Sequence, residues 1–346
     1  MSSFEPFLPL LTVAMIAAVT LYVSRLRRSL KAFEVTVLVL LLSIPLLMLG
    51  IYRLDFYGMG IFVALPLLIG FVSVLLYGRN APERTWRECR NIAIGSTLAV
   101  GTSVLLAGIE GVVCLAMASP IVLFLSLAGG VIAYSLRASF WRRRSSPALL
   151  LLLLLSAPLL MGAEAAVPRQ APVYAVRTAV EIDAPPEAVW RNVVSFRQLP
   201  PPDDWVFHTG IAYPVRAEIR GRGVGAVRYC EFSTGPFVEP IVVWDEPRRL
   251  AFRVTANPPA LQELSPWGRI HPPHVQGFLV SRRGQFLLTP LPGGRTRLEG
   301  TTWYQHGLYP AGYWRLWSDW IIHRIHLRVL GHVKRLSEEA TERVAL

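Results

Sequence analysis

The chain has 346 residues, of which 53% are hydrophobic, and a mean hydropathy of +0.42, which is high for a water-soluble protein and indicates a membrane portion. The formal net charge of +12 divides equally, with +6 from residues 1–166 and +6 from the remainder. The positive charge is therefore not concentrated in one basic patch, and we predict no nucleic-acid partner. The three cysteines, Cys89, Cys114 and Cys230, show the spacing of neither a metal site nor a disulfide framework.

Residues 1–166 consist largely of apolar segments, each close to the ~20 residues that cross a bilayer core. They predict an all-α transmembrane domain of six helices, placed in a bacterial inner or plasma membrane with the lipid bilayer as its partner. The predicted spans are 7–23, 33–52, 60–77, 92–108, 112–136 and 148–161.

The sixth segment has a second interpretation. Arginines at 142–144, a leucine-rich core and the small residues Ala163 and Ala165 resemble a secretory signal that is cleaved after Ala165. Cleavage would release the C-terminal domain, whereas an intact segment would anchor it. In both cases the segment exports that domain.

The loops between the predicted spans differ sharply in charge. The loops after the first, third and fifth spans carry four Lys or Arg each, while the other two loops together carry only Arg53. Positive residues mark the cytoplasmic side of a membrane. We therefore predict that the N-terminus and everything after residue 166 are extracytoplasmic.

Ionisable residues inside a bilayer are candidates for function. Glu34 and Glu110 stand at the ends of predicted spans, where residues of solvated loops are expected. The spans show no paired charges and no repeat of broken helices, so nothing in them indicates a pump or channel.

The remainder of the chain begins with a linker at 167–172 and then alternates apolar and polar residues over 176–182, which predicts a strand. A helix follows, for which Asp183 is placed to cap and Pro185 and Pro186 suit the first turn.

Three hairpins and a long helix complete the pattern. Strands at 215–219 and 227–232 flank a glycine-rich turn, strands at 237–244 and 250–256 flank 245–248, and strands at 285–289 and 296–304 flank 292–294. A helix is predicted from about residue 311 to 335.

This order of elements resembles the SRPBCC (START-like helix-grip) superfamily, in its polyketide cyclase/dehydrase and lipid transport branch, over about residues 173–338. The phrases FVEPIVVWDEPRRLAFRV and GGRTRLEGTTWY are typical of that branch. The resemblance implies an α+β domain at 173–346 whose curved antiparallel sheet grips the C-terminal helix around a cavity. Such cavities are mostly apolar.

Strand alternation and helical spacing predict which residues face that cavity, although the same residues would also suit a filled core. On the last helix the candidates follow a stripe at i, i+3, i+7 and i+11. The predicted ligand-binding residues are Ala217, Ile219, Phe252, Val254, Leu298, Thr302, Tyr304, Trp314, Trp317, Ile321 and Ile325.

The segment 257–275 is long for a strand connection, which suits a lid over the cavity, a contact with the bilayer or an ordinary surface excursion. It contains His271 and His274, while His323 and His326 lie three residues apart on the last helix. No carboxylate or cysteine stands beside them at ligand spacing, so we predict no metal site and no cofactor. His323 and His326 are expected on the solvated side of the helix.

The sequence contains no nucleophile elbow and no acid–base motif, and we assign no catalytic residue. We therefore predict a membrane-anchored protein that binds a lipid or another hydrophobic small molecule. One alternative is a cyclase/dehydrase-like or hydrolytic enzyme in the same cavity, using scattered groups such as Tyr304, Arg253 or His271. Another is a structural or regulatory module of the membrane half. The oligomeric state is left open.

Overall fold

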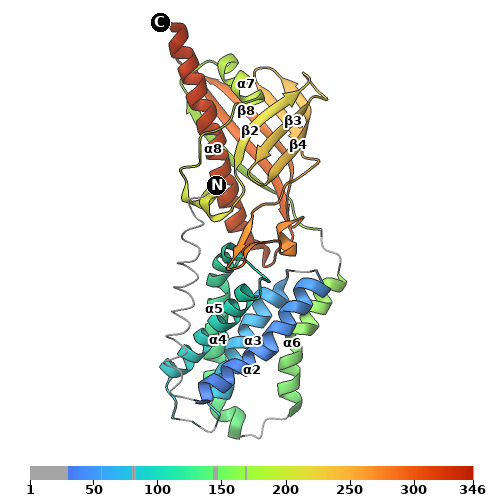
Figure 1. Ribbon diagram of the computed structural model, residues 1–346, viewed down its shortest axis with the longest axis vertical. Coiled ribbons are helices and arrows are strands. Elements are labelled where there is room, and N and C mark those ends of the chain that lie inside the picture. Colours follow the sequence, from blue (N-terminus) through green and yellow to red (C-terminus); the bar gives the residue numbers. More distant parts are fainter. Residues whose placement is uncertain are drawn as a thin grey trace. The chain divides into compact units, whose positions relative to one another are not determined.

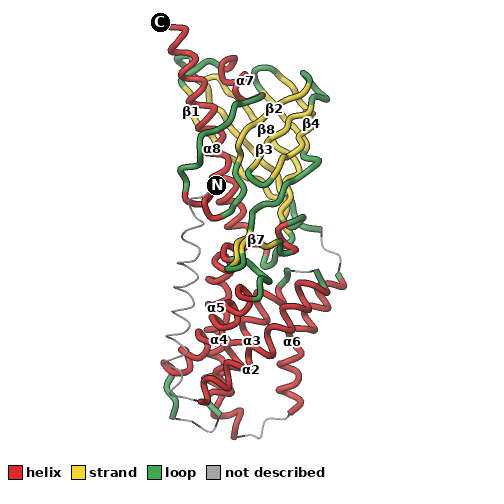
Figure 2. Tube along the Cα trace, in the orientation of Figure 1, coloured by secondary structure: helices red, strands yellow, loops and turns green. Residues whose placement is uncertain are grey.

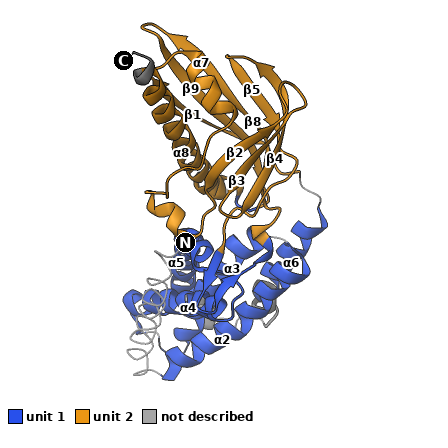
Figure 3. Cartoon of the chain, turned by 45° about the horizontal axis from the view of Figure 1, so that its top comes forward, with its two compact units in different colours: residues 1–169, 263–273, 308–310 blue, residues 170–262, 274–307, 311–346 orange. Residues whose placement is uncertain are grey.

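The computed structural model describes residues 30–55, 57–79, 81, 83–142, 147–167 and 170–345. The chain divides into two compact units (Figure 3). The helical unit comprises Met1–Arg169, Glu263–Pro273 and Leu308–Pro310, and the sheet unit comprises Gln170–Gln262, His274–Gly307 and Ala311–Leu346.

The helical unit is built from apolar helices joined by short connections (Figure 1). Thr85 and Glu88 form a capping box, which fixes the start of α4. In chain order the elements are α2 (Leu30–Met48), η1 (Leu49–Arg53), η2 (Gly60–Ala64), α3 (Leu65–Tyr77), α4 (Trp86–Leu106), α5 (Val112–Arg142) and α6 (Pro147–Ala166).

Within the described residues, four helices rather than six are long and apolar enough to cross a membrane. The predicted span 7–23 lies outside the described residues. The predicted span 148–161 falls within α6, whose apolar part from Leu154 to Ala166 is a shorter helix. The four candidates are Leu30–Arg53, Gly60–Tyr77, Trp86–Leu106 and Val112–Leu136.

Small residues bring α3 and α5 into close contact. A Cβ atom on Gly70 would lie 1.7 Å from the carbonyl oxygen of Ser126, and one on Gly129 would lie 2.1 Å from that of Leu67. Ser126 also shares a hydrogen bond of 2.7 Å with Thr97 of α4. These helices therefore pack backbone to backbone, as small residues allow between apolar helices.

Two buried carboxylates of the helical unit are Glu110, in the connection before α5, and Glu164, in α6. Glu110 accepts a hydrogen bond of 2.8 Å from the Tyr57 hydroxyl, so the prediction that it lies in a solvated loop is wrong. Glu164, which no sequence motif singles out, accepts the backbone N–H groups of Met59 and Gly60 at 3.0 and 2.9 Å. Both are buried because their partners come from a connection more than 50 residues away, which local pattern does not reveal.

A small hairpin, β6 (Glu263–Ser265) and β7 (Gly268–Ile270), also belongs to the helical unit. The fully buried Glu263 accepts the Cys114 N–H in the first turn of α5 at 2.9 Å. The Trp267 indole donates to the Leu106 carbonyl at 2.6 Å. This part of the segment 257–275 is therefore a packed hairpin anchored on helix ends.

The sheet unit is a seven-stranded antiparallel sheet with helices on its concave face (Figure 2). Its strand order is β1-β9-β8-β5-β4-β3-β2, which agrees with the expected helix-grip arrangement. The elements are β1 (Tyr174–Ile182), α7 (Pro186–Val194), η3 (Trp205–Thr209), β2 (Pro214–Arg220), β3 (Val227–Phe232), β4 (Gly235–Asp245), β5 (Arg249–Arg253), η4 (Pro273–Val275), β8 (Leu279–Leu291), β9 (Arg295–His306) and α8 (Ala311–Ala345).

The predicted strands are present, but β5 ends three residues before the predicted 256 and β8 begins six residues before the predicted 285. Two details at the helices also differ. The N-cap of α7 is Pro185, with Pro186 at the first helical position, so the prediction that Asp183 caps the helix is wrong. The Asp183 N–H instead donates to Glu338 at 2.9 Å. This bond is possible because α8 runs about ten residues beyond its predicted end and reaches the start of α7.

The core of the sheet unit lies between the concave face, α7 and α8. Alternate residues of the strands point into it, as a period of two requires. Its largest fully buried apolar side chains are Ile182, Ile241, Leu250, Leu298 and Leu330.

Candidate functional site

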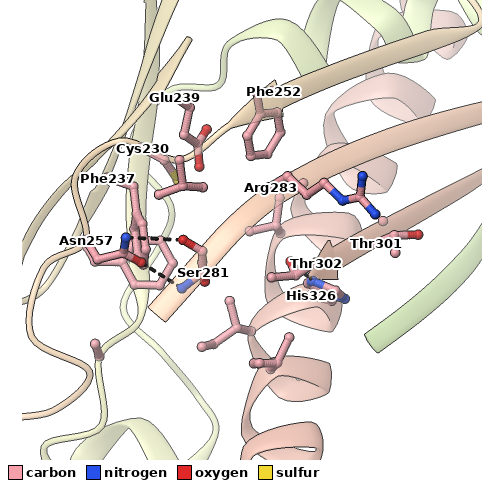
Figure 4. A pocket seen from close by; sticks show the side chains of 18 of the residues that line it. Cys230, Phe237, Glu239, Phe252, Asn257, Ser281, Arg283, Thr301, Thr302 and His326 are labelled. Atoms are coloured by element: carbon pink, nitrogen blue, oxygen red, sulfur yellow. Dashed lines mark hydrogen bonds between the residues drawn. The ribbon is translucent and has the colours of Figure 1, made fainter. Parts of the chain in front are cut away.

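A cavity of about 140 Å³ lies in the sheet unit between the concave face of the sheet and α8 (Figure 4). Strands β3, β4, β5, β8 and β9 supply one side and α8 the other, and residues 257–260 complete the wall. The wall is mainly apolar, because the same alternation that fills the core continues around the cavity.

Aromatic rings form much of the wall. Phe232 and Phe237 pack edge to face with centroids 4.7 Å apart, and the centroids of Phe252 and Phe286 lie 6.2 Å apart. Gly284 is the register partner of Phe252, and a Cβ atom there would lie 2.5 Å from the Phe252 ring. The Phe252 ring therefore fits only because Gly284 has no side chain.

A buried ion pair stands among these rings. Arg228 of β3 and Glu239 of β4 are register partners and form a direct ion pair, with side chains 2% and 8% exposed. The Arg228 guanidinium lies 5.6 Å from the centroids of both Phe252 and Phe286. Burial raises the pKa of Glu239, and the positive charge of Arg228 opposes that rise. Two charges in an apolar wall are costly unless they are paired.

One N–H group of Arg228 does not take part in the ion pair. The Nε–H of Arg228 is buried and has no hydrogen-bond partner within the described part of the chain. Cys230, two residues along β3, also lines the cavity, and burial raises the pKa of its thiol to about 12. The thiol is therefore protonated at neutral pH and is a poor nucleophile.

A hydrogen-bonded chain joins α8 to the sheet. His326 shares a hydrogen bond of 2.7 Å with Thr302 through Nε2 and one of 3.1 Å with Thr178 through Nδ1. His323 Nδ1 lies 2.7 Å from the same Thr178 hydroxyl. We call these four residues the histidine–threonine chain. Burial lowers the pKa of His326 to about 4, with a smaller contribution in the same direction from His323, so His326 is neutral at pH 7.

The expectation that both histidines face solvent is therefore wrong for His326. It lines the cavity, whereas His323 is exposed and still reaches Thr178. The i, i+3 spacing placed them on one face of the helix correctly. The physical reason for the error is that the hydroxyls of two strands satisfy the ring nitrogens, which makes this polar face compatible with burial.

A side-chain clamp holds the cavity wall at residues 257–260. Asn257 accepts the Ser281 N–H at 2.8 Å and donates to the Ser281 carbonyl at 3.2 Å (Figure 4). The side-chain amide of Asn257 thus makes the two hydrogen bonds with Ser281 that the backbone of a neighbouring strand would make. This end of the long segment is part of the cavity wall.

The predicted ligand-binding residues fall into two groups. Five line the cavity, namely Phe252, Val254, Thr302, Ile321 and Ile325. The other six lie away from it, namely Ala217, Ile219, Leu298, Tyr304, Trp314 and Trp317.

The six make packing contacts, Trp314 among them, which is buried and packs edge to face with Tyr313. Ala217 and Leu298 belong to the hydrophobic core, and Ile219, which is partly buried, packs against it. Tyr304 is fully buried, and its hydroxyl donates to Asp319 at 2.5 Å. Burial and Asp319 raise the pKa of Tyr304 above its ordinary value. Trp317 packs edge to face on Trp320, with centroids 6.4 Å apart.

None of the scattered groups considered for catalysis lines the cavity. Arg253 and His271 are exposed, and Tyr304 is committed to Asp319. The two buried charged residues that line it, Arg228 and Glu239, were not predicted, because a charged residue in an alternating strand is ordinarily assigned to the solvent face. A signal existed, since Arg228 shares its face with Cys230 and Phe232.

Residues 174–313 match the family described as polyketide cyclase / dehydrase and lipid transport. Among curated proteins the chain has no match.

Several solved structures are similar to about half of this chain. The Zhui aromatase/cyclase of Streptomyces sp. R1128 is 16% identical, covers 49% of this chain and 96% of its own, and has a TM-score of 0.34. Norcoclaurine synthase of Thalictrum flavum is 10% identical, with coverages of 50% and 97% and a TM-score of 0.32. A protein of Nitrosomonas europaea is 14% identical, with coverages of 49% and 96% and a TM-score of 0.30.

Proposed function

Because residues 174–313 belong to the polyketide cyclase/dehydrase and lipid transport branch of the SRPBCC superfamily, we propose that this chain is a membrane-anchored protein that binds a hydrophobic small molecule in the cavity beside α8. A cavity of about 140 Å³ with aromatic walls is the observation that carries the proposal. Apolar concave sites with a few polar groups are the usual form of small-molecule sites.

The ligand we propose also carries a hydrogen-bond acceptor, such as a carbonyl or carboxylate oxygen. The support for this is the buried Nε–H of Arg228, which lacks a partner in the described residues and lies on the cavity wall. A buried donor without a partner costs free energy that a ligand oxygen would recover. The aromatic rings around Arg228 would hold the apolar part of the same molecule.

Membrane anchoring is part of the proposal. Four described helices are apolar and long enough to cross a bilayer, and the basic loops lie after alternate predicted spans. We propose on this basis that the sheet unit meets its ligand on the extracytoplasmic side. A ligand that partitions into lipid would be plentiful there, and lipid itself is one such molecule.

The test uses the full-length protein in lipid nanodiscs and the probe 1-anilinonaphthalene-8-sulfonate, which combines an aromatic body with an acceptor group. We expect a saturable fluorescence increase that Ile325→Trp abolishes, because the indole would fill the cavity. The matched control is Leu316→Trp, at an exposed position of the same helix, which should bind like the wild type. Equal saturable binding by all three proteins would refute the proposal.

A second candidate, a cyclase/dehydrase-like enzyme in the same cavity, is favoured by one observation. Ionisable groups within hydrogen-bond reach of each other, Arg228 and Glu239, line the wall together with His326. Such a set could polarise a carbonyl and move a proton. Chemical change of a bound molecule during incubation with the wild type but not with Arg228→Met would distinguish this candidate from simple binding.

A further inference from the structure

We propose that the histidine–threonine chain is a proton relay that exchanges a proton between a hydroxyl-bearing apolar molecule in the cavity and the surface of the protein. This goes beyond the proposed binding function and rests on it only in requiring that the cavity hold a molecule. The residues act in the order Thr302, His326, Thr178 and His323.

The geometry of the chain is continuous from the cavity to solvent. Thr302 and His326 line the cavity, Thr178 is buried behind them, and His323 is exposed. The three connecting distances are 2.7, 3.1 and 2.7 Å, all within hydrogen-bond range. Both ring nitrogens of His326 are used, so the ring links two hydroxyls with no gap.

Two proton arrangements with neutral rings direct all three bonds the same way along the chain, as a relay requires. In the first, each donor points outward: the Thr302 hydroxyl donates to His326 Nε2, His326 Nδ1–H donates to Thr178, and the Thr178 hydroxyl donates to His323 Nδ1. In the second, every bond is reversed, and the Thr302 hydroxyl is free to donate into the cavity.

The net passage of one proton along the chain, by one transfer at each bond, converts one arrangement into the other. In the outward arrangement, a ligand O–H breaks and its proton goes to the Thr302 oxygen. The Thr302 proton passes to His326 Nε2, the His326 Nδ1 proton passes to Thr178, and the Thr178 proton passes to His323 Nδ1. His323 then releases its Nε2 proton to water. The electron pair stays on the ligand oxygen, and the reverse sequence returns a proton to it.

Because His326 is buried, its ring passes a proton on and does not remain in the protonated, positively charged form. An imidazolium at this position would be desolvated among Ile322, Ile325 and Val329, so the positive charge is disfavoured there. Of the charged residues that line the cavity, Arg228 and Glu239 compensate each other's charge, and Arg283 is exposed to solvent. A neutral ring that receives at one nitrogen as it gives at the other avoids the buried charge altogether.

The experiment uses the full-length protein in lipid nanodiscs with 2-naphthol, a bicyclic phenol that becomes strongly acidic on excitation. Binding is measured by the anisotropy of the saturable fraction, and proton transfer by the naphtholate emission of that fraction. We expect naphtholate emission from the wild type and its loss in Thr178→Val, because the substitution interrupts the relay outside the cavity and keeps the side-chain shape. Naphtholate emission that persists in Thr178→Val would overturn the relay.

Two variants separate the relay from damage to the fold. Thr178→Ser keeps the hydroxyl and should keep the naphtholate emission, and Thr289→Val removes an exposed hydroxyl of β8 and should change nothing. If Thr178→Ser lost the emission while still binding 2-naphthol, the relay would also be overturned.

If 2-naphthol does not bind, that result counts against the binding function and not against the relay. A second measurement, which needs no ligand, then tests the relay. In protein labelled with ¹⁵N in the histidine rings, both rings exchange between tautomers if the relay exists. We expect the Nδ1 and Nε2 signals of both rings in the wild type to lie between the positions of a protonated and an unprotonated ring nitrogen, because each ring exchanges its tautomers. Signals at the positions of one fixed tautomer in either ring would refute the relay.

Discussion

Arg228 and Glu239 face each other across β3 and β4 and form an ion pair whose two side chains are almost completely buried. They lie on the concave face of the sheet, where alternation would otherwise place apolar residues. Buried ion pairs rarely add net stability over apolar residues of the same volume, and this agrees with the recognition role proposed above for the pair.

Removing one member of this pair should be more harmful than removing both. We predict that Glu239→Leu lowers the free energy of unfolding of the sheet unit by about 3–5 kcal/mol, because it leaves the Arg228 charge buried and unpaired. The double variant Arg228→Met/Glu239→Leu should recover most of the loss. Chemical unfolding followed by near-ultraviolet circular dichroism measures both, and a double variant no more stable than the single one would contradict the prediction.

Gly284 should tolerate no side chain while Phe252 is present. A Cβ atom would lie 2.5 Å from the Phe252 ring, so we predict that Gly284→Ala destabilises the sheet unit by about 1–3 kcal/mol through overpacking. Adding Phe252→Leu should restore part of the stability. Thermal unfolding measures the stability of the single and double variants. If the two substitutions lower the stability additively in the double variant, this contact is not the cause.

Protonation of His326 should oppose folding. Its folded pKa of about 4 lies below the ordinary value of 6.5, so the unfolded chain binds more protons between these values. The stability contributed by the neutral ring is complete above pH 6.5 and falls as the pH drops toward 4, by up to about 3 kcal/mol. His326→Gln should flatten the stability profile between pH 7 and 4. An unchanged slope in the variant would mean that other groups control the acid range.

The hairpin β6–β7 should depend on one carboxylate. Glu263 accepts the Cys114 N–H at the start of α5, an arrangement worth about 0.5–2 kcal/mol in helix capping. We predict that Glu263→Ala speeds hydrogen exchange in 263–270 and in the first turn of α5. Glu218→Ala, an exposed ion-pair residue of β2, serves as the control. Exchange rates that match the control would show that the hairpin is held by other contacts.

The charge pattern predicts that residues 167–346 lie outside the cytoplasm. Three loops of four Lys or Arg each stand against a single Arg53, and a misplaced arginine costs about 2.5–3.5 kcal/mol at the bilayer centre. Alkaline phosphatase fused after Ala166 should be active, and a fluorescent protein that folds only in the cytosol should be dark at the same position. The opposite pair of readings would mean that the number of crossings before Ala166 is odd where we predict it to be even.

Much of the sheet unit could be predicted because its information is local. Each of its main signals lies within one short stretch of sequence. These signals are the alternation in 176–182 and 296–304, the glycine turn at 292–294 and the apolar stripe of the last helix. The same stripe placed Ile321 and Ile325 at the cavity, since 3.6 residues per turn determine which side chains share a face.

The polar part of the site depended on contacts between distant stretches. Periodicity predicts that His323 and His326 share a face, but not that the hydroxyls of Thr178 and Thr302, more than 100 and about 20 residues away, satisfy their rings. Burial of Glu110 and Glu263 likewise depends on Tyr57 and on the first turn of α5. A polar group is buried only where a partner offsets its desolvation, and partners that meet through folding leave no mark in the local pattern. The sequence by itself therefore determined the strands, turns and helix faces, and the tertiary structure alone decided which charged and polar side chains those faces enclose.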